Sequence, residues 1–356
     1  MSAYKIRLTI HSFLLCTISI ATAQDVHFSQ FTMSPLTTNP ALAGAQNDIQ
    51  AIANYKNQWL SVAAPYTTMA FSYDMRLTSA KSQRGFWAAG INIYDDKSGD
   101  EQLSLLQANL SLAYHIRLDE YNTIGAGFQG GYAQHSISYG GLQWGNQYNG
   151  SIYDSGLPSG EPNGGGVARS YIDAGAGVLW VYNNTSGKEK VTDNHDFTMN
   201  IGASIFHPQQ PEYSLYNDGE VLYRKFVVHG DARISIPNSN MALVPGFIYT
   251  RQQNTQEIYA GSLLRFKFVQ ESKTTGYYKI SAFSFGAYYR AADALSAVLM
   301  LEIANFALGM SYDINLSPLQ TVSGLRGGFE ISLKYLAANT SLKRSKSFFH
   351  PASQTQ

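Results

Sequence analysis

The stretch QLSLLQANLSLAYHIRL, residues 102–118, decides the fold because its two faces suit two different solvents. Apolar side chains alternate with polar or small ones, which is the period of two that a β-strand imposes. A strand of a soluble sandwich would also alternate, but a bilayer is spanned by only about 9 to 11 residues tilted near 45°. We therefore predict a strand in the wall of a membrane barrel. One face carries Leu106, Ala108, Leu110, Leu112, Tyr114, Ile116 and Leu118, and the other carries Gln107, Asn109, Ser111, Ala113, His115 and Arg117.

Residues 1–23 have the features of a secretory signal peptide. Lys5 and Arg7 precede a mostly apolar run from Leu8 to Ile20, and Ala21-Thr22-Ala23 supplies the small residues of a cleavage site. The apolar run is shorter than the roughly 18 residues that a membrane-spanning helix requires. We expect the mature chain to begin at Gln24. Since Cys16 is the only cysteine, the mature chain would have no thiol for a disulfide or a metal.

The rest of the chain is poor in charged residues and rich in aromatic ones. Charged residues make up 14% of the sequence, against about 25% in ordinary soluble domains. There are 24 Tyr, 18 Phe and 31 Gly residues, and the formal net charge is zero. This composition favours an all-β outer-membrane barrel. The strands of such a barrel are recognised in the sequence by alternating apolar and polar residues. The charge balance does not indicate a nucleic-acid partner.

Alternating segments recur along the chain and predict a transmembrane antiparallel β-barrel of about 14 strands. An even number suits a barrel of the bacterial outer membrane. Pro245 lies inside one segment, where we expect a β-bulge because proline interrupts a ladder of backbone hydrogen bonds. The predicted strands are Ile49–Trp59, Thr67–Leu77, Gly85–Asp95, Gln102–Leu118, Asn122–Ser138, Tyr171–Tyr182, Phe197–His207, Lys225–Ile236, Ala242–Thr250, Glu257–Phe268, Lys279–Arg290, Leu295–Ile303, Phe306–Tyr312 and Phe329–Tyr335.

Loop lengths predict how the barrel is oriented. If the chain enters from the periplasm, connections after even-numbered strands are short and periplasmic. Residues 119–121, 237–240 and 304–305 fit, and the long connection 139–170 follows an odd-numbered strand, although 183–196 and 269–278 fit less well. We expect the barrel to cover residues 48–336, both termini to lie in the periplasm, and residues 337–356 to form a polar basic tail. The alternative interpretation of this tail is simple disorder.

Residues 24–47 do not alternate, and Ser34-Pro35 and Asn39-Pro40 oppose a long helix. Because this segment precedes the first wall strand, we expect it to fold back as a plug, with Phe28, Gln30, Asn39, Pro40, Ala41 and Gly44 as plug residues. The charged residues predicted to face the lumen either form structural ion pairs or line a polar path. A filled lumen is favoured, because wide aqueous channels occur in barrels of roughly 16 to 18 strands and this barrel is predicted to have about 14. The predicted lumen charges are Asp74, Arg76, His115, Arg117, Asp173, Asp231, Arg233, Arg265, Lys267, Glu302, Glu330 and Lys334.

Motifs for catalysis and cofactor binding are weak. GAGFQG at residues 125–130 matches the letters of a dinucleotide fingerprint, but it lies inside a predicted strand and not between a strand and a helix. Asp95, Asp96, Asp100 and Glu101 crowd a turn that is either solvated or able to hold calcium. The histidines have no metal spacing, and no G-x-S-x-G motif occurs. We expect no enzyme activity, no catalytic residue, no cofactor and no assigned metal site.

The Gly-, Asn- and Tyr-rich segment at residues 139–166 is typical of an external loop. Its aromatic residues are either partner contacts, as loops often provide, or girdle and turn residues. Candidate partner-binding residues are Trp144, Tyr148 and Tyr153 in this loop, Asp313 and Asn315 near the last strands, and Lys343, Arg344 and Lys346 in the tail.

Motifs at both ends of the mature chain resemble those of the PorP/SprF family of the type IX secretion system. The first are QDVHFSQF at residues 24–31, NPALAG at 39–44 and YKNQW at 55–59. The others are SYDINLS at 311–317 and GFEISLKY at 328–335. Val26-His27 and the Arg326-Gly327-Gly328 lead-in depart from the usual family pattern.

This resemblance implies a non-enzymatic barrel in contact with outer-membrane lipid. It implies partners in the periplasmic ring of the type IX machinery, or a large exported adhesin-type protein that the barrel helps to reach the surface. The NPALAG box is also similar to the N-terminal hatch of FadL-type fatty-acid transporters, so a passive transporter of a hydrophobic or small solute is the rival interpretation. The motifs do not decide between these functions.

Overall fold

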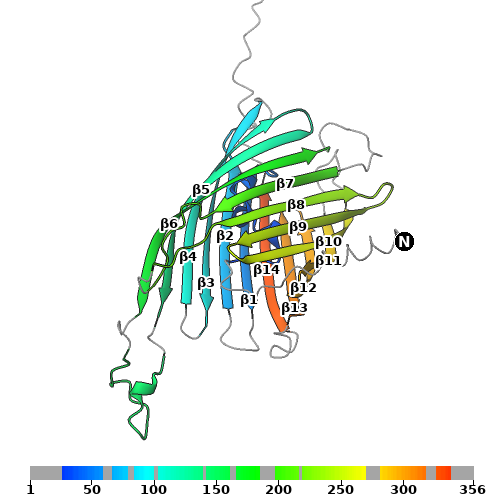
Figure 1. Cartoon of the computed structure of the whole chain (residues 1–356). Coiled ribbons are helices and arrows are strands. Elements are labelled where there is room, and N and C mark those ends of the chain that lie inside the picture. Colours follow the sequence, from blue (N-terminus) through cyan, green and yellow to red (C-terminus); the bar gives the residue numbers. More distant parts are fainter. Residues whose placement is uncertain are drawn as a thin grey trace, which may run out of the picture.

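The computed structural model describes residues 26–58, 66–78, 84–99, 103–138, 142–160, 166–184, 197–215, 219–269, 281–317 and 326–337. Fourteen antiparallel strands form one closed barrel in which each strand pairs with its sequence neighbours and β1 pairs with β14 (Figure 1). Within these ranges, no helix is long and apolar enough to cross a membrane. The predicted fold class is confirmed.

The strands form where the sequence alternates, and all fourteen predicted strands are present. The largest differences are later ends of β3 and β13, an earlier start of β6 and a longer β14, because residues that extend these strands alternate less clearly. The strands are β1 (Ile49–Gln58), β2 (Tyr66–Arg76), β3 (Gly85–Ser98), β4 (Leu103–Arg117), β5 (Asn122–Ile137), β6 (Val167–Asn183), β7 (Phe197–Phe206), β8 (Lys225–Ser235), β9 (Met241–Gln252), β10 (Thr255–Val269), β11 (Ser281–Arg290), β12 (Ala294–Ile303), β13 (Phe306–Asn315) and β14 (Arg326–Ala337).

The two faces of β4 differ as the alternation predicts. Leu110 on the outer face is 62% exposed, whereas its neighbour Ser111 on the inner face is fully buried. The exposed apolar side chains continue around the barrel, for example Phe128 on β5, Val178 on β6 and Phe226 on β8. A continuous band of exposed apolar side chains is typical of a surface that faces lipid. The wall therefore has the arrangement of a membrane barrel.

The predicted bulge at Pro245 is wrong. Proline pairs with Ser262 of β10 without a change of register. On the β8 side, pairing stops after Asp231–Gly246 and resumes at Ile234–Leu243 in the same register. The strand therefore accommodates the missing N–H by leaving a gap in the ladder and not by inserting a residue. Register shifts occur instead between Lys267 and Val269, and between Tyr312 and Ile314.

Three short helices lie before the first strand, inside the barrel (Figure 1). They are η1 (Phe31–Met33), α2 (Pro35–Thr38) and η2 (Pro40–Leu42). Prolines at the starts of α2 and η2 fix the backbone for one turn and prevent a longer helix from forming. We call residues 26–48 the plug.

The two mouths of the barrel are distinguished by their connections. We call the end where even-numbered strands finish the even mouth, and the opposite end the odd mouth. The plug begins at the odd mouth, where the Lys56 side chain meets the carbonyl of His27, and it reaches the even mouth, where Arg76 meets Gly44. The last described residue, Ala337, ends β14 at the even mouth. The first and last described residues therefore lie near opposite mouths, whereas the termini, which were predicted to lie on one side, are outside the described residues.

Candidate functional site in the plugged lumen

The inner wall is polar, and the plug covers much of it. Inward residues of β4 such as Gln107, Asn109 and Ser111 are buried, although no strand packs against their face. Buried polar groups need hydrogen-bond partners. Gln107 finds its partners on the wall, in Tyr94, Asn109 and Asp173, whereas other inward residues, such as Glu330 and Arg76, bind the backbone of the plug. The site is therefore a set of contacts between one irregular segment and a polar cylinder.

The first contact is an ionic cluster at the odd mouth. Glu330 of β14 accepts hydrogen bonds from the backbone N–H groups of Ser29 at 2.7 Å and Gln30 at 3.1 Å. Ser29 Oγ donates to Asp313 Oδ2 at 2.8 Å, and Tyr259 OH donates to the carbonyl of Ser29 at 2.8 Å. These hydrogen bonds come from three strands and converge on two residues. We call this group the odd-mouth latch.

Two buried cations belong to the same latch. Lys56 Nζ donates to the carbonyl of His27 at 2.8 Å. Arg290 donates to Ser29 Oγ at 3.3 Å and lies 3.6 Å from Asp313 Oδ2. Its guanidinium also lies 5.2 Å from the centre of the Tyr259 ring. Buried charges are tolerated when they are paired and hydrogen-bonded, and here the plug backbone supplies part of that pairing.

The latch changes the interpretation of several predicted residues. Glu330 faces the lumen as predicted, but Asp313 and Asn315, proposed as partner-binding residues, are buried inside the barrel. Asp313 contacts the plug, and Asn315 Nδ2 donates to the carbonyl of Arg326. Lys56 and Arg290 were missed. The alternation could have placed them in the lumen, because Lys56 and Arg290 each lie two residues from an inward residue, Asn54 and Tyr288.

The second contact holds the Asn39-Pro40-Ala41 turn in the middle of the lumen. Asn39 Oδ1 accepts a hydrogen bond from the Ala41 N–H at 2.8 Å and so caps η2. The Asn39 side-chain amide donates to the carbonyl of Val178 on β6 at 3.0 Å and to His229 Nε2 on β8 at 3.1 Å. One asparagine therefore fixes both the turn and its place on the wall.

Three inward glycines on neighbouring strands make room for this turn. A Cβ atom added at Gly127 of β5 would lie 2.5 Å from the Ala41 nitrogen. One added at Gly202 of β7 would lie 2.7 Å from Asn39 Nδ2, and one at Gly177 of β6 would overlap the Asn39 side chain. Glycine in a strand often marks the close approach of another backbone. We call Gly127, Gly177 and Gly202 the glycine seat.

The third contact is at the even mouth. Arg76 of β2 donates to the carbonyls of Gly44 at 2.7 Å and Ala45 at 3.0 Å, and it pairs with Asp48 at 2.9 Å. Asp74 accepts a hydrogen bond from the Gly44 N–H at 3.0 Å. Gly44 has a φ of +61°, which glycine adopts without strain. The chain therefore turns sharply out of the lumen and into β1.

Apolar side chains of the plug pack against two different parts of the wall. Phe31 packs with Tyr259, Leu263, Tyr288 and Val298 on β10 to β12. Leu36 packs with the alanines of the plug, β3 and β4. The plug thus crosses the lumen with a hydrophobic anchor on each side. Among the predicted lumen charges, Arg265 pairs with Glu302, Arg76 with Asp48, and Asp173 with His207, which was not predicted. Glu330 and Asp74 instead accept hydrogen bonds from the plug backbone. Arg117, at the end of β4, is exposed.

The described part of the long connection between β5 and β6, residues 142–160, projects from the odd mouth beyond these strands (Figure 1). It contains the short helix η3 (Gly145–Gln147) and a bridge between Tyr148 and Tyr153. Tyr148 is 58% exposed, and the Tyr153 hydroxyl donates to Gln147. The candidate residues Trp144, Tyr148 and Tyr153 thus lie together, far in sequence from the buried Asp313 and Asn315. Lys343, Arg344 and Lys346 lie outside the described residues.

The remaining sequence motifs are a glycine-rich segment of β5 and an acidic turn that is only partly described. GAGFQG lies within β5 and has no helix after it, so the glycines do not form a phosphate loop. Asp100 and Glu101 of the acidic turn lie outside the described residues. Across the described ranges, no group of three or more His, Cys, Asp or Glu side chains is placed to hold a metal ion.

A comparison with protein families identifies the chain. The model of the type IX secretion system membrane protein PorP/SprF matches residues 20–335. The chain belongs to the PorP/SprF family. The match includes the plug, the first thirteen strands, the connection between β5 and β6, and β14 except its last two residues, so the family pattern covers the plugged lumen described above. A search of curated proteins finds no match.

Solved structures similar to this PorP/SprF chain are other barrels at low sequence identity. CdiB from Acinetobacter baumannii is 8% identical with a TM-score of 0.42, and the match covers 81% of this chain and 60% of that one. The TodX monoaromatic hydrocarbon channel deltaS2 mutant is 11% identical with a TM-score of 0.46, covering 85% and 93%. The CymD monoaromatic hydrocarbon channel is 11% identical with a TM-score of 0.43, covering 90% and 95%.

Proposed function

We propose that this PorP/SprF chain is a non-enzymatic, plugged barrel that binds protein partners at its rims during type IX secretion. The observation that carries the proposal is the plug, because a lumen crossed by a latched segment has no room for a folded polypeptide. A protein partner must then be met outside the lumen. Family membership supplies the type IX context.

The proposed orientation puts the even mouth in the periplasm. The longest connection, at residues 138–166, belongs to the odd mouth, and outer-membrane barrels usually have long loops outside and short turns inside. The tail after Ala337 would then face the periplasmic ring, with Lys343, Arg344 and Lys346 as its contacts. Trp144, Tyr148 and Tyr153 would face an exported adhesin-type protein. Exposed aromatic residues are frequent anchors at protein interfaces.

The test is a set of variants in a strain that lacks the chromosomal gene. One variant replaces residues 142–160 with a Gly-Ser linker, and another ends after Ala337. We expect the first to reduce the amount of adhesin at the cell surface and the second to reduce co-purification with ring proteins. The amount of folded barrel in the outer membrane should stay constant in both. Normal surface adhesin and motility in the strain without the gene would contradict the whole proposal.

A further inference from the structure

Two cavities lie beside the plug along the same wall strand. The first, at the odd mouth, has about 650 Å³ of empty space and the second about 540 Å³, and both volumes include space that is open to solvent. Lys225 and Val227 of β8 line the first cavity, and the next inward residues, His229 and Asp231, line the second. Alternate residues of a strand are about 7 Å apart. The two cavities are therefore one step apart along the inner face of β8.

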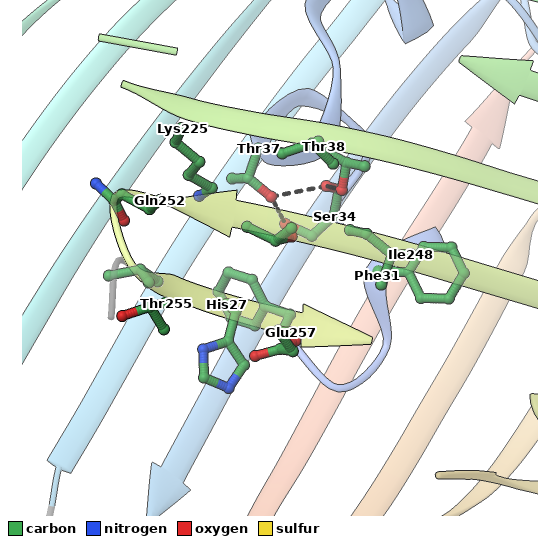
Figure 2. A pocket seen from close by; sticks show the side chains of 14 residues that line it. His27, Phe31, Ser34, Thr37, Thr38, Lys225, Ile248, Gln252, Thr255 and Glu257 are labelled. Carbon is green, nitrogen blue, oxygen red and sulfur yellow. Dashed lines mark hydrogen bonds between the residues drawn. The ribbon is translucent and has the colours of Figure 1, made fainter. Parts of the chain in front are cut away.

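Two plug residues, Phe31 and Thr38, line both cavities and so stand between them. The Phe31 ring meets Tyr259 and Tyr288 edge-on, at centroid distances of 6.3 and 5.9 Å. A Cβ atom added at Gly246 of β9 would lie 3.0 Å from this ring. Figure 2 shows Phe31 and Ile248 together at one end of the first cavity, and Lys225 and Gln252 toward the other. The partition is therefore largely one aromatic side chain.

Thr38 forms the fixed part of the partition. Its carbonyl accepts a hydrogen bond from Ser204 Oγ at 2.6 Å, and its hydroxyl donates to the carbonyl of Ser34. It is followed directly by Asn39, which the wall holds through β6 and β8. Phe31 is held by packing, whereas Thr38 is held by hydrogen bonds. Removing the Phe31 ring should therefore join the cavities without releasing the plug.

The linings combine charges of both signs with uncharged polar groups. Lys225 and Glu257 line the first cavity, and Asp74, Asp231 and Lys334 line the second. Threonine hydroxyls and the amides of Gln46, Asn47, Gln50 and Gln252 complete the polar surface. Such a lining complements solutes that carry both charges and gives no general preference for ions of one sign. Both volumes include space that is open to solvent, so only part of each cavity is enclosed, which favours small solutes over large ones.

We propose that the two cavities are the halves of one path for small zwitterionic solutes, and that the Phe31 side chain closes this path. The path runs between the plug and β8, from the odd mouth toward the even mouth. This activity is separate from the proposed secretion role and does not rest on it. The secretion role can fail while the path exists, and the reverse also holds.

The test measures swelling of liposomes that contain the purified full-length mature barrel, with glycine or raffinose as the external solute. Phe31→Ala should raise the rate of swelling in glycine about tenfold, which corresponds to a barrier lower by about 1.4 kcal/mol. Raffinose is several times larger than glycine and tests whether the opening admits only small solutes, so it should give no increase. Leu36→Ala is the matched control, because it truncates a buried apolar plug residue that packs against β3 and β4 and lines neither cavity.

A second variant keeps the test decisive. Val227→Trp in the Phe31→Ala background should fill the joined space from the wall and restore the slow rate. If Phe31→Ala does not fold, Phe31→Leu should give a smaller increase in glycine entry. Equal increases for Phe31→Ala and Leu36→Ala would mean general loosening of the plug and would overturn the proposal. Entry of raffinose, or no increase in glycine entry for a folded Phe31 variant, would also overturn it.

Discussion

Glu330 accepts a hydrogen bond from the backbone N–H of Ser29 at 2.7 Å, and this contact joins residues that are 301 positions apart in the sequence. The same carboxylate also accepts the N–H of Gln30. Glu330 lies on the strand that closes the barrel against β1, so the contact links plug docking to barrel closure. A plug of this kind cannot be fully seated before the last strand is in place.

Loss of the Glu330 charge should loosen the start of the plug. Glu330→Gln retains the size of the side chain but weakens two charge-assisted hydrogen bonds, which contribute about 1.5 to 3 kcal/mol each when intact. We expect faster proteolysis near residues 26–31 and a lower thermal unfolding midpoint. Glu302→Gln is the control because Glu302 pairs with Arg265 and makes no described hydrogen bond to the plug. Equal protease sensitivity of the two variants would argue against the latch.

Filling the glycine seat should displace the Asn39-Pro40-Ala41 turn. Gly177→Val adds a side chain where Asn39 lies, and overpacking of this kind typically costs about 1 to 3 kcal/mol. With Ala41→Cys as a reporter in the mature chain, we expect maleimide labelling to become faster in the Gly177→Val background. Gly130→Val is the control, since a Cβ atom there meets nothing within 4 Å. Unchanged labelling in a folded Gly177→Val barrel would show that the seat does not hold the turn.

The free-energy cost of placing a charged side chain on the outer face should depend on its depth in the bilayer. Leu110→Arg puts a cation near the middle of the apolar band of β4, where arginine costs about 2 to 4 kcal/mol. Gln134→Arg on β5 lies nearer the odd mouth and should cost only about 0 to 1 kcal/mol. Unfolding by denaturant in lipid vesicles measures both values. Similar costs for the two variants would contradict the proposed position of the bilayer.

A single exposed tyrosine should affect the proposed partner without affecting the barrel. Tyr148→Ser removes a ring that is 58% exposed in the loop at residues 142–160. We expect less exported adhesin at the surface and the same amount of folded barrel, measured by surface immunolabelling and by heat-dependent mobility in gels. Asn238→Gly, in the short turn at the opposite mouth, is the control, because glycine adopts the φ of +58° at this position without strain. A defect in barrel assembly for Tyr148→Ser would assign the residue a folding role instead.

Much of the wall could be predicted because alternation is a local property. Leu110 and Ser111 face lipid and lumen because consecutive side chains of a strand point in opposite directions, whatever the neighbouring strands are. Turn residues between such segments then give the number of strands. The bulge expected at Pro245 failed because a closed ladder can lose two pairs and keep its register, which depends on both neighbouring strands.

The sequence by itself determined the barrel, its fourteen strands and the existence of a non-alternating segment before them, because periodicity and proline positions act through nearby bonds. Only the tertiary structure decided where that segment lies and what holds it. Asn39 meets Gly177 and Gly202, and Ser29 meets Glu330, through contacts between residues more than a hundred positions apart. The tertiary structure also shows that Asp313, which was expected to contact a partner, is a buried part of the odd-mouth latch. Contacts of this range exist only once the cylinder has closed, because closure alone brings β14, β6 and the plug into one space.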